Sequence, residues 1–68
     1  MSSKNETLTI RLKDGHVVYA ILSPSGTVYY RRGGGGETKV PGGETHDAAV
    51  AVRRVCAHLG ITQDQIKK

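Results

Sequence analysis

Hydrophobic and polar residues alternate along the first part of the chain, from Thr7 to Lys13. Leucine and isoleucine occupy one side of this alternation, and threonine, arginine and lysine occupy the other side. A period of two is typical of a β-strand with one buried face. Residues 1–6 are mostly polar, and we predict that they form a disordered tail in front of this strand.

The pair Asp14-Gly15 follows the strand and predicts a two-residue hairpin turn, because glycine adopts positive φ easily. The second strand then runs from His16 to Leu22. Its pairing is set by the turn, which places Lys13 opposite His16. The pairs that follow are Leu12–Val17, Ile10–Tyr19 and Leu8–Ile21 on the core side, and Arg11–Val18 and Thr9–Ala20 on the other side.

A second turn is predicted at Ser23-Pro24-Ser25-Gly26, and a third strand from Thr27 to Arg32. A loop of even length places Val28 and Tyr30 on the core side and leaves Tyr29 and Arg31 outside. A three-residue loop with a bulge reverses these sides. Hydrophobicity favours the first arrangement, and either one projects one tyrosine and one arginine from the outer face.

The segment from Gly33 to Gly43 is rich in glycine and is predicted to be a flexible loop, in which Thr38 to Val40 can add a short edge pairing. A helix follows from about Asp47 to Leu59. Thr45 or Asp47 caps its start, and Gly60 caps its end. Its apolar face is formed by Ala48, Val52, Val55 and Leu59, with Cys56 beside them. We expect Ile61 and Ile66 to fold back onto the core.

These elements predict one α+β domain over residues 7–68, in which a three-stranded antiparallel meander packs against one C-terminal helix. One helix covers only one face of a sheet, so the other face stays open. On this face or beside it we expect a set of binding residues: Arg11, Lys13, His16, Val18, Tyr29, Arg31, Arg32 and Lys39.

The net charge of +4 suits a polyanionic partner. The single cysteine excludes an intramolecular disulfide, and the longest apolar run is too short to cross a membrane. Nothing resembles a signal peptide, so we expect a cytoplasmic setting. Arginines that contact phosphates or bases and a tyrosine that stacks predict nucleic-acid binding, with DNA as the first candidate.

The order of three strands and one helix is similar in outline to the arm-binding domains of phage-type integrases and to the apetala-type plant DNA-binding domain. The resemblance covers about Val17 to Leu59, and it depends on the Pro24-Ser25-Gly26 turn and the alanine-rich helix. It implies a sheet that enters the major groove. The same order resembles the second half of a double-stranded-RNA-binding domain, but the first helix and the lysine cluster of that domain are absent.

Enzymatic motifs are not found. Gly33 to Gly36 lacks the lysine of a phosphate loop, and the three histidines do not form a metal-binding pair with Cys56. We therefore predict a non-enzymatic module without a cofactor or metal. The alternative is a protein-interaction module, such as a small phage-like inhibitor or modulator, or a homodimer closed through the same face. That alternative depends on a strip of apolar residues expected to be outside: Val18, Ala20 and Leu22.

Overall fold

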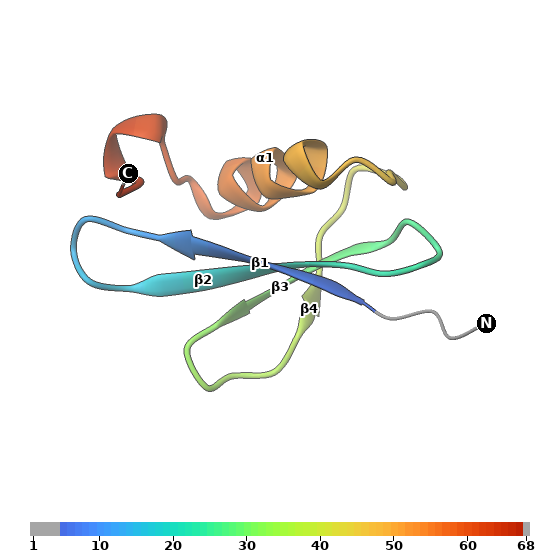
Figure 1. The fold of residues 1–68 in the computed structure, drawn as a ribbon, viewed down its shortest axis with the longest axis horizontal. Coiled ribbons are helices and arrows are strands. Elements are labelled where there is room, and N and C mark those ends of the chain that lie inside the picture. The colour runs from blue at the N-terminus through green and yellow to red at the C-terminus, as the bar shows by residue number, and fades with distance from the viewer. Residues whose placement is uncertain (1–4, 68) are drawn as a thin grey trace.

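The computed structural model describes residues 5–67 and shows a four-stranded antiparallel sheet with a helix on one face (Figure 1). The strands follow one another in the order β1-β2-β3-β4, which confirms the α+β meander and the short edge pairing expected near Thr38. The elements are β1 (Glu6–Arg11), β2 (Val17–Leu22), β3 (Val28–Arg32), β4 (Thr38–Lys39), α1 (Ala48–Leu59) and the 3-10 helix η1 (Gln63–Gln65).

The predicted disordered tail, residues 1–6, is tested only at its end. Residues 1–4 lie outside the described residues, and Glu6 already belongs to β1, so the tail prediction is wrong for Glu6.

The turn between β1 and β2 contains three residues, so the predicted two-residue turn is wrong. The amide of Leu12 donates to the carbonyl of His16 at 2.9 Å, and the amide of Gly15 donates to the carbonyl of Leu12 at 3.1 Å. Lys13 and Asp14 therefore belong to the loop together with Gly15, whose φ is 93°. This is the three-residue hairpin loop in which a type I turn is followed by a residue with positive φ.

The longer loop shifts the pairing of β1 and β2 by one residue. Ile10 pairs with Val18 and Arg11 with Val17, where the two-residue turn had placed Tyr19 and Val18. Because side chains alternate between faces, this shift exchanges the two faces of β2. The residues now buried on the helix side are Val18, Ala20 and Leu22, which are 2%, 0% and 6% exposed.

The turn between β2 and β3 has the same geometry. The amide of Ser23 donates to the carbonyl of Thr27 at 3.0 Å, and Gly26, with φ of 94°, donates to the carbonyl of Ser23 at 2.9 Å. This second odd loop reverses the faces once more. Val28 and Tyr30 therefore lie on the helix side, as hydrophobicity predicted, although the even loop length assumed for this arrangement was wrong.

The caps of α1 are those that the sequence predicts. The Asp47 carboxylate accepts hydrogen bonds from the amides of Ala49 and Val50 at 2.9 and 3.4 Å, and Gly60 ends the helix with φ of 74°. The helix buries Val55 and Cys56 as expected. Ala51, which the predicted apolar face did not include, is fully buried as well.

The C-terminal segment closes one end of the sheet. Ile66 forms an antiparallel bridge with Leu12, flanked by hydrogen bonds from the Lys13 amide to the Gln65 carbonyl (2.8 Å) and from the Lys67 amide to the Arg11 carbonyl (2.7 Å). Ile66 packs against the core, as does Ile61, which confirms that this segment folds back.

The β2–β3 turn also contacts the segment that leads into α1. The amide of Thr45 donates to the carbonyl of Gly26 at 2.9 Å. Gly26 is buried, and a Cβ atom placed on it would lie 3.1 Å from the Cβ of Glu44. Gly15 has nearly the same φ, but the space around it is empty to 4 Å.

These two glycines provide a matched test of the packing at the β2–β3 turn. Gly15→Ala meets only the strain of positive φ, which costs about 1 kcal/mol of unfolding free energy. Gly26→Ala has the same strain and must in addition displace Glu44, so we expect a loss of about 2 to 3 kcal/mol. Urea unfolding of the two variants measures both losses. Equal losses would contradict the close contact of Gly26 with Glu44.

Candidate functional site on the open face of the sheet

The face of the sheet that α1 leaves uncovered is called the open face here (Figure 1). The strand register assigns its side chains without ambiguity, because successive residues point to opposite sides. Its members are Thr7, Thr9, Arg11, Val17, Tyr19, Ile21, Tyr29, Arg31 and Lys39.

The open face combines positive charge with aromatic rings. Each of β1, β3 and β4 contributes one basic residue, and β2 and β3 contribute one tyrosine each. None of the nine strand positions on this face is acidic. Two acidic residues lie close to these positions along the chain: Glu6, which the register turns to the other side of the sheet, and Glu37, which comes two residues before Lys39. The charge of the face is therefore positive along the strands.

Arg31 and Tyr19 form the central contact of the open face. They are cross-strand neighbours, and the guanidinium carbon of Arg31 lies 4.8 Å from the centre of the Tyr19 ring. A cation at this position is attracted by the ring, with about 0.5 to 1 kcal/mol at an exposed site. The Nε atom of Arg31 is buried and has no acceptor among the described residues, so the terminal nitrogens are the donors available to a ligand.

Ile21 is a buried residue of the open face. It points away from the helix, yet it is only 3% exposed and is separate from the main core cluster. Its cross-strand neighbours are Thr7 and Tyr29. Burial of a large aliphatic side chain on this side stabilises the fold.

A shallow hollow of about 320 Å³ lies at the end of the open face near the β1–β2 turn. It brings Arg11 and His16, which the sequence predicts as binding residues, together with Tyr19 and Lys67. Lys67 reaches this place because its amide pairs with Arg11. The hollow thus gathers two permanent cations and an imidazole around one aromatic ring.

Within this turn, His16 is held by Asp14. The Asp14 carboxylate accepts hydrogen bonds from the His16 amide and from the ring Nδ1, both at 2.9 Å. These contacts, the backbone hydrogen bond first, lower the pKa of Asp14 below its ordinary value of 3.8. The imidazole is therefore oriented by a carboxylate and takes part in the geometry of the turn.

The predicted binding residues divide into three groups. Arg11, Tyr29, Arg31 and Lys39 lie on the open face, and Lys13 and His16 lie in or beside the β1–β2 turn. Arg32 is exposed at the end of β3, but the register turns it to the other side of the sheet.

The prediction that Val18 is a binding residue is wrong. It was expected outside, and it is buried in the core because the β1–β2 loop has three residues.

Tyr19 and Lys67 are the residues with candidate binding groups in the hollow that escaped the sequence analysis. Tyr19 was assigned to the core by the same error of register that exposed Val18. A glycine in the third loop position of both turns is the signal that would have corrected it. Lys67 had no local signal, because its place depends on a pairing with β1, far away in the sequence.

Other kinds of site find no support in the part of the chain that the structure describes. No group of three or more histidine, cysteine, aspartate or glutamate residues between 5 and 67 could hold a metal ion. No helix in that range is long and apolar enough to cross a membrane. Comparisons with models of protein families, with curated proteins and with solved structures found no match.

The turn allows a prediction on pH. Since folding lowers the pKa of Asp14, its contacts stabilise the fold above the unfolded pKa, and this stabilisation is lost as the pH falls through the lower, folded pKa. An NMR titration should find the Asp14 pKa below 3.8. His16→Ala should raise this pKa only in part, because the backbone amide still donates. Complete return to 3.8 in this variant would contradict the leading role of the amide.

Proposed function

We propose that this protein is a small non-enzymatic module that binds nucleic acid on the open face of its sheet. The observation that carries the proposal is the make-up of that face, in which Arg11, Arg31 and Lys39 surround two tyrosines and no strand position is acidic. Basic side chains attract phosphates, and aromatic rings offer stacking to bases. The net charge of +4 also favours a polyanionic partner.

The contact between Arg31 and Tyr19 supports this proposal in a specific way. Arginine loses much side-chain freedom when it binds a phosphate, and that loss weakens binding. A guanidinium already held over a ring, here with 4.8 Å between its carbon and the ring centre, has lost part of this freedom beforehand. Its planar fork of donors also suits the oxygens of a phosphate.

The hollow near the β1–β2 turn gives the backbone of the ligand a second contact. Arg11 and Lys67 line it together with His16, and all three side chains are exposed. Spacing of basic groups along the face, from this hollow to Lys39 on β4, provides a path for successive phosphates. Such contacts position a nucleic acid without reading its sequence.

The apolar strip on which the protein-interaction alternative was based is not on the open face. The apolar strip of Val18, Ala20 and Leu22 is part of the core under α1, so it is not a surface that a second copy could cover. A homodimer or another protein partner stays a prediction. No contact of the described residues favours it over nucleic acid.

We place this activity in the cytoplasm. Cys56 is a free, buried cysteine, and burial raises the pKa of its thiol, so the thiolate is disfavoured. A buried, protonated thiol that acts as a small apolar residue is the common role of cysteine in a reducing compartment.

Arg31 and Arg32 test the proposal as a matched pair, because they are neighbours in sequence and lie on opposite sides of the sheet. The logarithm of the affinity falls linearly with the logarithm of the salt concentration, and each phosphate contact makes this slope steeper by about 0.9. Binding of a labelled oligonucleotide, followed by fluorescence anisotropy at increasing salt, should therefore show a slope smaller by about 1 for Arg31→Gln. Arg32→Gln should leave the slope as in the parent protein.

The controls keep folding and binding apart. Circular dichroism and the protection of the Cys56 thiol from a thiol reagent report whether each variant is folded. If the folded parent protein binds neither DNA nor RNA at low salt, the proposed function is wrong. Equal effects of the two arginine variants would show that the wrong face was chosen.

A further inference from the structure

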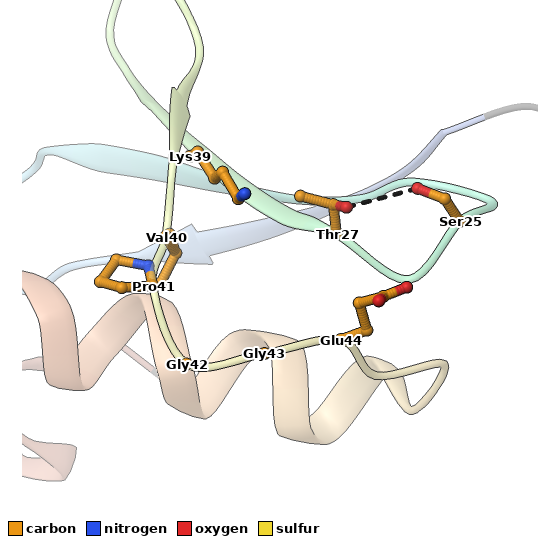
Figure 2. Close-up of a pocket in the computed structure, with 8 residues that line it drawn as sticks. All are labelled: Ser25, Thr27, Lys39, Val40, Pro41, Gly42, Gly43 and Glu44. Carbon is orange, nitrogen blue, oxygen red and sulfur yellow. Dashed lines mark hydrogen bonds between the residues drawn. The ribbon is translucent and has the colours of Figure 1, made fainter.

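A second hollow, here called the corner pocket, lies between the β2–β3 turn, the end of β4 and the segment 41–44 (Figure 2). Its volume is about 570 Å³, which is within the range of small-molecule sites. Figure 2 shows the side chains of Lys39 and Glu44 directed into the space between this turn and the Pro41–Glu44 segment. The lining residues are Ser25, Thr27, Lys39, Val40, Pro41, Gly42, Gly43 and Glu44.

The walls of the corner pocket are held in place by the fold. On one side, Glu44 packs against Gly26, and the next residue, Thr45, donates its amide to the Gly26 carbonyl. On another side, Arg54 of α1 donates to the carbonyl of Gly43 at 2.6 Å. The glycine segment is therefore fastened to both the turn and the helix, so the pocket is formed before a ligand arrives.

A chain of hydroxyl groups forms the wall next to the turn. The oxygen of Ser25 is 2.9 Å from that of Ser23 and 3.3 Å from that of Thr27. Each hydroxyl has one proton, so the two bonds of the chain use two of three protons. When both bonds run toward Thr27, its proton is free, and when they run the other way its hydroxyl donates to Ser25. Thr27 can thus donate to a ligand or accept from one.

The polarity of the corner pocket separates it from the hollow near the β1–β2 turn. Lys39 supplies a donor, Thr27 supplies either role, and the Glu44 carboxylate supplies acceptors only. No salt bridge joins Lys39 and Glu44 among the described residues, so both groups remain available. A phosphate has acceptors only and is repelled by a carboxylate. The edge of a nucleobase carries donors and acceptors side by side, and it fits this set.

The position of the pocket indicates how a strand would reach it. Lys39 of the pocket is the cross-strand neighbour of Tyr29, the tyrosine of β3 on which a base can stack. Arg11 on β1 and Lys39 on β4 lie three strand spacings apart across the sheet, or about 14 Å. They are also offset along the strands by four residues, because the register places Lys39 level with Thr7. The major groove of a DNA duplex is about 12 Å wide, and its bases are paired. A single strand can cross the sheet and place an unpaired base in the corner pocket.

We infer that the open face takes single-stranded nucleic acid and that the corner pocket receives one unpaired base through Lys39, Thr27 and Glu44. This inference deepens the proposed function and rests on it. The basic hollow and Arg31 hold the phosphates, Tyr29 stacks a base, and the corner pocket makes the affinity depend on which base is present. A module of this kind prefers some bases without a strict sequence requirement.

The test uses fluorescein-labelled homopolymers of about ten nucleotides, as DNA and as RNA, and a DNA duplex of equal length. With the full chain at low salt, the preferred single strand should bind about tenfold more tightly than the duplex. Glu44→Gln and Thr27→Val should change the ratio of affinities between homopolymers by roughly two- to tenfold, the effect of one hydrogen bond. The DNA and RNA series show which sugar is accepted.

Glu37→Gln is the matched control for the charge of Glu44. Both glutamates are exposed, and they lie on opposite sides of β4 in the sequence, but only Glu44 lines the pocket. The control variant removes the same negative charge, so it should strengthen binding to all homopolymers equally. A change of base preference in Glu44→Gln but not in Glu37→Gln assigns the effect to the pocket.

The outcomes distinguish the inference from the proposed function. A duplex that binds as tightly as every single strand overturns the single-strand inference and leaves nucleic-acid binding intact. Folded Glu44→Gln and Thr27→Val proteins with the parent's base preference overturn the role of the corner pocket. Failure of all probes to bind overturns the proposed function, and this inference with it.

Discussion

The three-residue turn between β1 and β2 is the constraint on which the rest of the structure depends. Positive φ at Gly15 closes a loop with an odd number of residues, and this loop sets the pairing of Ile10 with Val18. A slip by one residue would exchange the faces of β2. The same turn geometry recurs at Gly26. Together the two glycines determine which residues form the core and which tyrosines reach the open face.

Much of the fold could be predicted because its signals are local. An N-cap at Asp47, a left-handed glycine at Gly60 and apolar residues at helical spacing are sufficient to locate α1. The strands are marked by alternation and by turn residues. The two-residue β4 was harder to predict, because glycines precede and follow it and its pairing with β3 is the only evidence for it.

The face of β2 could not be predicted from its pattern. Its sequence is apolar on both sides, with Val17, Tyr19 and Ile21 on one and Val18, Ala20 and Leu22 on the other. Either set makes a reasonable core, so hydrophobicity gave no preference and the turn alone decided. The outward position of Tyr29 and Arg31 was nevertheless predicted, because an error in each of the two loops cancelled in β3. The agreement for β3 therefore did not come from a correct register.

Because β2 is apolar on both sides, it contributes both to the stability of the fold and to the candidate site. A chain of 68 residues has a small core, and here the additional burial is found on the open face, where Ile21 lies between Thr7 and Tyr29. The C-terminal segment acts similarly, since the bridge of Ile66 with Leu12 adds to the core and brings Lys67 beside Arg11. Residues that complete the fold therefore also position the groups of the candidate site. A candidate binding face built in this way needs no separate scaffold, which is how so short a chain can combine a core with a basic surface.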